Sequence, residues 1–126
     1  MSGLCLTAAA LSVALPLQGF TLAWKHSIEK IRWEEDYRIV GQRLHLAEAR
    51  IRGSGAGMEP PAGAILKDGV WHYKPAVPPL PRLQLARSSH VVDYELCWDA
   101  VCRPLKDVVG SVDAAPAVEL FPCDSR

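Results

Sequence analysis

Apolar and polar residues alternate with a period of two between residues 20 and 51, and this pattern restricts the fold more than any other feature of the chain. Such alternation is typical of β-strands that bury one side and expose the other. It predicts strands over residues 20–28, 31–40 and 43–52. The predicted inner sides comprise Phe20, Leu22, Trp24 and His26 in the first strand, Ile31, Trp33, Glu35, Tyr37 and Ile39 in the second, and Leu44, Leu46, Glu48 and Arg50 in the third. We therefore expect a polar minority among the interior hydrophobes.

Turn-forming residues extend this strand pattern over the rest of the chain. Gly41-Gln42 and Asp68-Gly69 have the composition of two-residue hairpin turns. The ten prolines suit short strands joined by fixed turns better than helices, because proline inside a helix costs about 3 kcal/mol. Residues 104–109, which begin with proline and precede a glycine, predict one short helix. Further strands are expected over residues 11–17, 65–73, 82–88, 91–101 and 117–121.

These signals predict an all-β fold, an antiparallel barrel or sandwich of about seven to nine short strands with at most one short helix near the C-terminus. A chain of 126 residues supports one hydrophobic core, so residues 1–126 are expected to form a single domain. Lysine plus arginine and aspartate plus glutamate both number 14, so no nucleic-acid partner is expected.

The apolar residues 1–17 are interrupted by Pro16 and are too short for a membrane-spanning helix, which takes about 20 residues. A secretion signal carries a lysine or arginine before its apolar run, and residues 1–17 have none there. We expect a first strand or hairpin here and no transmembrane segment. A degenerate secretion signal and an alanine-rich helix are the alternatives.

The four cysteines form an even set. If residues 99–100 form a hairpin turn, Cys97 faces Cys102 in a non-hydrogen-bonded pair, within the range of a disulfide. Cys5 and Cys123 would then tie the two ends of the chain together. Both bonds imply an oxidising compartment such as the periplasm, and a cytoplasmic location is the alternative because no clear signal peptide is visible. Free buried thiols and a tetrahedral zinc site are the alternatives, although zinc-binding cysteine pairs are usually separated by about two to four residues.

His26, Glu35 and Glu48 are the polar candidates for a site, because adjacent antiparallel strands would bring them onto one inner face. A carboxylate beside an imidazole raises the pKa of the imidazole and fixes its tautomer, which is the minimum for general base catalysis. The alternative is a structural network in which these groups and Arg50 satisfy one another. Ser27 lies on the face opposite His26, so a Ser–His nucleophilic pair is not expected. No catalytic residue is therefore assigned.

The glycine-rich segment 53–57, with Gly55 and Gly57, offers backbone N–H groups that would suit an anion. A phosphate-binding loop, however, is followed directly by a helix, and Pro60 and Pro61 prevent a regular helix there. We expect a bulge or a wide turn at this segment. Neither a metal nor a cofactor is implied.

One block of the chain reads His26-Ser27-Ile28-Glu29 and is followed by Glu35, and a second block reads Gly55-Ala56-Gly57. Read together, these blocks resemble the domain of unknown function 1850 (DUF1850) family. The segment at residues 86–90, which reads ARSSH, and the three C-terminal cysteines are also similar to the family. The likeness therefore covers nearly the whole chain.

The resemblance implies a small β-rich protein of a family without an established activity, whose members are often found beside tripartite ATP-independent periplasmic (TAXI-type) transporters. It implies a non-enzymatic accessory or binding protein outside the cytoplasm, linked to solute uptake, with a transporter component or a small solute as its partner. The candidate binding residues or polar network are His26, Ser27, Glu29, Glu35, Glu48, Arg50, Gly55 and Gly57. The alternatives are an enzyme that uses a His26/Glu35 acid–base pair and a structural zinc-binding domain.

Overall fold

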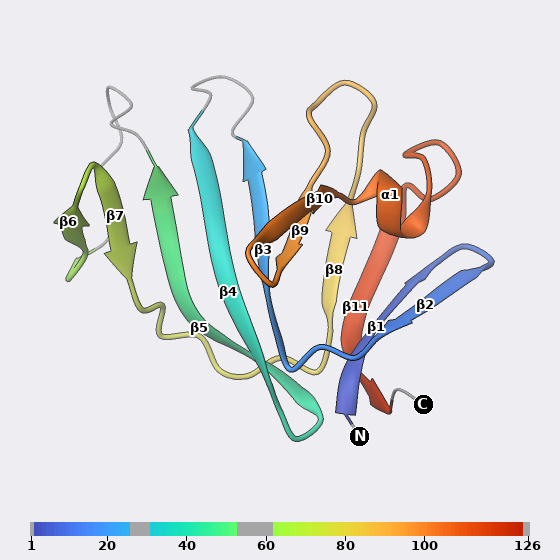
Figure 1. Cartoon of the computed structure of the whole chain (residues 1–126), viewed down its shortest axis with the longest axis horizontal. Helices are drawn as coiled ribbons and strands as arrows, with labels where there is room; N and C mark the ends of the chain where they lie inside the picture. Colours follow the sequence, from blue (N-terminus) through green and yellow to red (C-terminus); the bar gives the residue numbers. More distant parts are fainter. Residues whose placement is uncertain (1, 26–30, 53–61, 125–126) are drawn as a thin grey trace.

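The computed structural model describes residues 2–25, 31–52 and 62–124, which form eleven β-strands and one short α-helix (Figure 1). The strands are β1 (Ser2–Ala8), β2 (Leu11–Leu15), β3 (Gly19–Lys25), β4 (Arg32–Val40), β5 (Arg43–Arg52), β6 (Ile65–Lys67), β7 (Val70–Tyr73), β8 (Leu83–Ala86), β9 (Glu95–Trp98), β10 (Val101–Pro104) and β11 (Ala117–Asp124). The helix, α1, spans Lys106–Val109.

These strands form two open antiparallel sheets. The four-stranded sheet has the order β2-β1-β11-β8, and the seven-stranded sheet has the order β10-β9-β3-β4-β5-β7-β6. In Figure 1 the seven-stranded sheet fills the left and centre of the view, with β1, β2 and β11 to its right. The predicted all-β fold is confirmed as a sandwich, and neither sheet closes into a barrel. The described part of the chain has more strands than predicted because short hairpin arms such as β6 and β10 form strands of their own.

The core lies where the inner faces of the two sheets meet. Alternate residues of β1 and β11 contribute from one sheet, and alternate residues of β3, β5 and β9 contribute from the other. The fully buried side chains include Leu4, Leu6, Val118 and Leu120 from the four-stranded sheet and Leu22, Leu44 and Leu96 from the seven-stranded sheet. Burial of each such side chain contributes about 1.5–3 kcal/mol relative to exposure. This apolar alternation is therefore what holds the two layers together.

A β-bulge in β5 changes which of its residues face the core. Asp36 of β4 lies opposite Glu48, but the next residue, Tyr37, lies opposite Leu46. Ala47 therefore has no partner on β4. The chain advances by two residues along β5 where it advances by one along β4. Such an extra residue moves every later side chain of the strand to the other face of the sheet.

The prediction that Leu44, Leu46, Glu48 and Arg50 share one face is wrong, and the bulge is the reason. Leu44 and Leu46 are buried in the core as predicted. Glu48 and Arg50 instead lie on the outer face, where Glu48 lies opposite Asp36 in the strand register. Strict alternation cannot hold across a strand that contains one unpaired residue.

The predicted two-residue turns are confirmed. Gly41-Gln42 joins β4 to β5, with Gly41 at φ +63°, where glycine avoids the steric cost of a side chain. Asp68-Gly69 joins β6 to β7 with φ values of +52° and +77°, the positive pair that suits the twist of a hairpin. Asp99 and Ala100 also have positive φ and place β10 beside β9.

The opening hairpin and the C-terminal helix were also predicted. Residues 2–15 form the β1–β2 hairpin through a turn at Ala9 and Ala10. The predicted helix begins at Lys106 rather than at Pro104, which ends β10, and it stops before Gly110 at φ +96°. In the described residues, no helix has the length and apolar character needed to cross a membrane.

Candidate functional site

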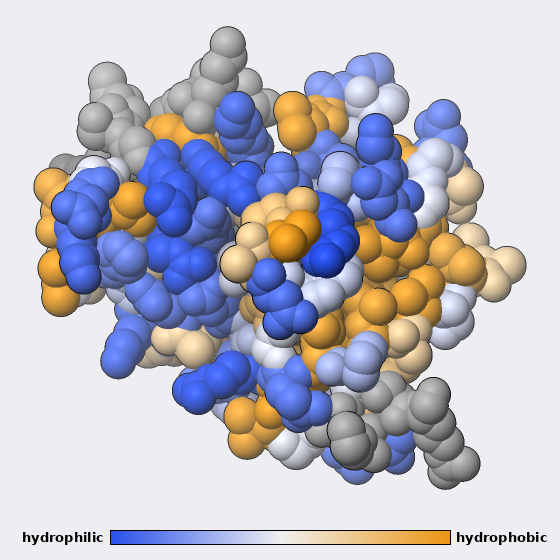
Figure 2. Space-filling view, viewed as in Figure 1, coloured by the Kyte–Doolittle hydropathy of each residue, from blue (hydrophilic) through white to orange (hydrophobic). Residues whose placement is uncertain are grey.

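Charged side chains cover the outer face of the seven-stranded sheet. The alternation that sends Trp33, Glu35 and Tyr37 inward sends Glu34 and Asp36 outward, and the bulge sends the last polar residues of β5 to the same side. Figure 2 shows the hydrophilic residues gathered over β4, β5 and β7. We call this surface the ionic face; its residues are Thr21, Arg32, Glu34, Asp36, Glu48, Arg50, Arg52, His72 and Glu95.

Glu34 lies at the centre of the ionic face, and its side chain is only 10% exposed. Its carboxylate accepts from Nε of Arg32 at 2.9 Å, from Nε of Arg50 at 2.9 Å and pairs with Nε of Arg52 at 3.1 Å. Burial alone would raise the pKa of Glu34, but the hydrogen bonds from the three arginines outweigh burial and hold the pKa at about 2. Glu34 is therefore charged under all ordinary conditions.

Arg50 joins Glu34 to a second carboxylate, Asp36. Its Nη1 and Nη2 donate to the two oxygens of Asp36 at 2.6 and 2.7 Å, a bidentate pair. The hydroxyl of Thr21 on β3 donates to the same carboxylate at 2.6 Å. Burial would raise the pKa of Asp36, but these bonds lower it, and the bond to Asp36 raises the pKa of Arg50 despite burial. The network thus spans β3, β4 and β5.

The network continues to both sides of the sheet. Toward β7, Glu48 lies 3.6 Å from Nη1 of Arg50, and its Oε1 lies 2.7 Å from Nδ1 of His72. Toward β9, Nη2 of Arg32 pairs with Glu95 at 3.0 Å. The network therefore extends over five neighbouring strands, β9-β3-β4-β5-β7, and its ion pairs centre on β4 and β5.

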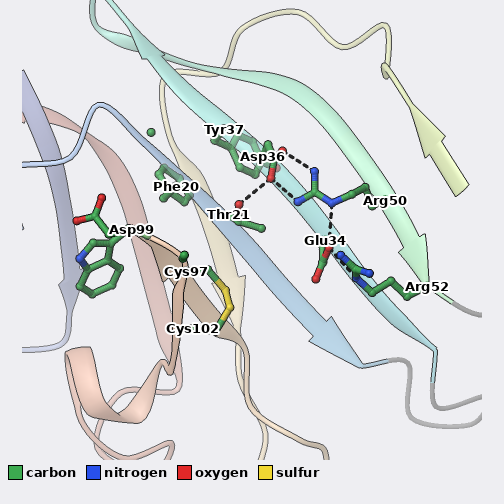
Figure 3. Close-up of a pocket in the computed structure, with 13 residues that line it drawn as sticks. Phe20, Thr21, Glu34, Asp36, Tyr37, Arg50, Arg52, Cys97, Asp99 and Cys102 are labelled. Carbon is green, nitrogen blue, oxygen red and sulfur yellow. Dashed lines mark hydrogen bonds and ion pairs between the residues drawn. A yellow bond between two sulfur atoms is a disulfide. The ribbon is translucent and has the colours of Figure 1, made fainter. Parts of the chain in front are cut away.

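A groove of about 410 Å³ lies between the ionic face and the hairpin formed by β9 and β10 (Figure 3). Thr21, Asp36 and Arg50 line it from the sheet, and the bond between Cys97 and Cys102 lines it from the hairpin. Figure 3 shows the guanidinium of Arg50 directed toward the Asp36 carboxylate beside this groove. Charged side chains held by ion pairs line one side of the groove, and a hairpin closed by a disulfide lines the other.

The four cysteines form the two predicted disulfides, Cys5–Cys123 and Cys97–Cys102. Within the described ranges, Glu95, Cys97 and Cys102 are also the one group whose donor atoms, all within 4.8 Å of one another, have a spacing suited to a metal. Zinc binds thiolates, and a sulfur in a disulfide is not a thiolate. In this oxidised state, the zinc alternative therefore lacks its ligands.

A family model described as Domain of unknown function (DUF1850) matches residues 20–105. The chain belongs to the DUF1850 family. No curated protein and no solved structure shows a significant match. In this DUF1850 chain the matched segment contains every residue of the ionic face and both cysteines of the hairpin disulfide. Strands β1, β2 and β11 lie outside it, and the other disulfide joins β1 to β11.

The structure separates the site residues that the sequence predicted together. Glu35 lies on the inner face of the sheet, opposite Leu22 and Ala49, whereas Glu48 and Arg50 lie on the outer face. The prediction that Glu35 and Glu48 share an inner face is therefore wrong, because the bulge moves Glu48 to the other face of the sheet. The other predicted site residues lie outside the described residues: His26, Ser27, Glu29, Gly55 and Gly57.

The centre of the ionic face was not among the site residues predicted from the sequence. Arg32, Glu34 and Asp36 alternate on the outer side of β4, and opposite charges tend to pair across neighbouring strands. That pattern was visible in the sequence. The partners of these residues on β5 could not be predicted, since they lie on this face only because of the bulge.

The lowered pKa of Glu34 predicts how the DUF1850 domain responds to acid. An unfolded glutamate binds its proton near 4.5, whereas folded Glu34 resists protonation until about 2, so the stability that it contributes is present above pH 4.5 and is lost toward pH 2. We expect Glu34→Gln to be less stable than the wild type at pH 7, with the difference disappearing near pH 2. Urea unfolding measured from pH 2 to pH 7 checks this.

The control for this pH series is Glu119→Gln, which removes a partly exposed carboxylate paired with Arg82 on the other sheet. Its stability should follow that of the wild type, because surface ion pairs contribute about 0–1 kcal/mol. A difference between Glu34→Gln and the wild type that stays constant with pH would contradict the prediction.

Proposed function

We propose that this DUF1850 domain is a non-enzymatic accessory protein that acts outside the cytoplasm and binds a component of a tripartite ATP-independent periplasmic transporter through the ionic face. The observation that carries the proposal is the continuous network from Glu95 to His72, in which each charged side chain is already held by a neighbour. Side chains that are ordered before binding lose little conformational entropy on binding. A patterned charged surface also selects its partner and speeds association.

The same network argues against acid–base catalysis on this face. An efficient general base has a pKa close to the working pH, and the pKa of Glu34 is about 2. Asp36 is likewise held as a carboxylate by Arg50 and Thr21. Groups that are fixed as charged are better suited to binding than to proton transfer.

The two disulfides support the proposed compartment. Disulfides form and persist in oxidising environments and are rare in the cytosol. Here one bond links β1 to β11 and the other braces the hairpin beside the groove. The choice of a transporter component as the partner rests on the resemblance of the chain to DUF1850 proteins found beside such transporters.

A binding measurement with two matched arginine variants tests the proposal. Arg52 pairs with Glu34 at the edge of the ionic face, and Arg82 pairs with Glu119 on the other sheet; their side chains are 48% and 54% exposed. The purified domain is titrated with the receptor and the membrane subunits of a TAXI-type transporter by biolayer interferometry. We expect one component to bind, about tenfold more weakly with Arg52→Ala and unchanged with Arg82→Ala.

Raising the salt concentration should also weaken this binding, because exposed charges are screened. The proposal fails if no transporter component binds the wild type. It also fails if Arg52→Ala and Arg82→Ala have the same effect.

A further inference from the structure

The inner face of the seven-stranded sheet places a carboxylate, Glu35, in a row of apolar residues. In this row Leu22 of β3, Glu35 of β4, Ala49 of β5 and Tyr73 of β7 lie opposite one another in turn. Neighbouring strands are about 4.8 Å apart, so the backbones at Glu35 and Tyr73 are about 10 Å apart. In this row only the methyl group of Ala49 lies between the two side chains. Ala49 is 1% exposed and forms a small, flat floor between two long side chains.

Aromatic rings surround this row on the same face. The adjacent row contains Trp24, Trp33 and Trp71, with Trp24 and Trp33 stacked at 6.4 Å between ring centroids. Tyr94 packs edge-on against Trp24 at 6.0 Å. On the other side, the hydroxyl of Tyr37 donates to Oε1 of Glu35 at 2.9 Å. We call Trp24, Trp33, Tyr37, Tyr73 and Tyr94 the aromatic cluster.

The negative charge of Glu35 acts electrostatically on two members of this cluster, Tyr73 and Tyr94. Burial, and then the charge of Glu35, raises the pKa of both Tyr73 and Tyr94. Most of the cluster is only half-buried: Trp24, Trp33, Tyr73 and Tyr94, like Glu35, each keep part of their surface exposed. The rings lie around the carboxylate, and none of these five groups is fully enclosed by the fold.

Glu35 differs from the carboxylates of the ionic face in what it contacts. Glu34, Asp36 and Glu48 each lie beside an arginine, whereas the hydrogen-bond partner of Glu35 is the neutral phenol of Tyr37. Among the described residues, no lysine, arginine or histidine pairs with Glu35. Burial raises its pKa, and the bond from Tyr37 only partly offsets this. A positive ligand would supply the charge that the described residues do not place beside Glu35.

We propose that Glu35 and the aromatic cluster bind a small alkylammonium ion, such as a quaternary ammonium group. Aromatic faces attract cations that lie within about 6 Å of the ring centroid, and tryptophan does so best. A metal ion would instead need several oxygen ligands. The site lies on the face of the sheet opposite the ionic face, so it goes beyond the proposed function and does not depend on it.

Choline and its neutral isostere, 3,3-dimethyl-1-butanol, test the proposal because they share a shape and differ in charge. Binding to the whole chain is measured by calorimetry and by tryptophan fluorescence. We expect choline to bind with a dissociation constant at least about tenfold lower than that of the isostere. Equal affinity, or no binding of choline at all, overturns the proposal.

Two variants and one control locate the site. Glu35→Gln keeps the shape of the side chain and removes its charge, and it should weaken choline binding about tenfold. Tyr73→Leu keeps an apolar side chain and removes a ring, and it should weaken binding about threefold. Glu119→Gln removes a carboxylate from the other sheet and should leave binding unchanged. Choline binding that Glu35→Gln leaves unchanged would overturn the assignment; if that variant fails to fold, the comparison of choline with its isostere on the wild type decides.

Discussion

Replacing both Cys5 and Cys123 with alanine is expected to lower the free energy of unfolding by about 4–5 kcal/mol. The bond joins residues that are 118 positions apart, so it restricts nearly the whole unfolded chain. It also fastens β1 to β11, the strands that carry Leu4, Leu6, Val118 and Leu120 into the core. Urea unfolding of the oxidised wild type and of the double variant measures the loss.

The second disulfide provides the matched control. Cys97 and Cys102 are only five positions apart, and the same loop-closure argument gives about 2 kcal/mol for their replacement by alanine. The ratio of the two losses tests the argument, since both double variants remove two sulfur atoms. Equal losses would show that local packing, and not the restriction of the unfolded chain, determines the effect.

Arg87→Ala is expected to destabilise the domain by about 3–5 kcal/mol, because it removes a buried guanidinium and leaves the largely buried carboxylate of Asp93 without its charged partner. The Arg87 side chain is 1% exposed and follows the end of β8. It donates to both oxygens of Asp93 at 2.9 and 2.8 Å, to the carbonyl of Ala115 at 2.8 Å and to the carbonyl of Gly110 at 3.0 Å. One side chain thus ties the end of β8 to Asp93 before β9, to Gly110 after the helix and to Ala115 before β11.

Asp93 explains why this loss should be large. Burial would raise the pKa of Asp93, but the bonds from Arg87 and from the backbone N–H groups of Lys106 and Tyr94 lower it, so it stays charged. Without Arg87, the two N–H groups are the only partners that the described residues leave to this charge. Arg82→Ala is the control, because Arg82 is exposed and its pair with Glu119 contributes about 1 kcal/mol or less. Thermal and urea unfolding compare the variants; similar losses for Arg87→Ala and Arg82→Ala would contradict the prediction.

Local signals in the sequence were sufficient for the fold class. The alternation in β3 and β4 predicted which residues face the core, and Phe20, Leu22 and Tyr37 are buried as expected. The turns at Gly41 and Asp68 were predictable because positive φ favours a small set of residues. The pairing of Cys97 with Cys102 followed from the length of one turn. Each of these depends on a few neighbouring residues.

The candidate site was predictable only in part. Glu35 was expected on an inner face and lies there, but Glu48 and Arg50 do not join it, because one unpaired residue at Ala47 reverses the end of β5. No residue type marks that bulge in the sequence. The role of Arg87 was also hidden, since its partners are the side chain of Asp93 and carbonyls more than twenty positions away.

By itself, the sequence determined that this chain forms antiparallel strands with one apolar side, where they turn, and that its cysteines suit two disulfides. Only the tertiary structure decided which charges meet on the ionic face, and that Glu35 lies among aromatic rings without a cationic partner in the described chain. The physical reason is the range of the interactions. Alternation and turn geometry act between neighbours along the chain, whereas ion pairs and ring contacts depend on the register between strands, which one extra residue can shift.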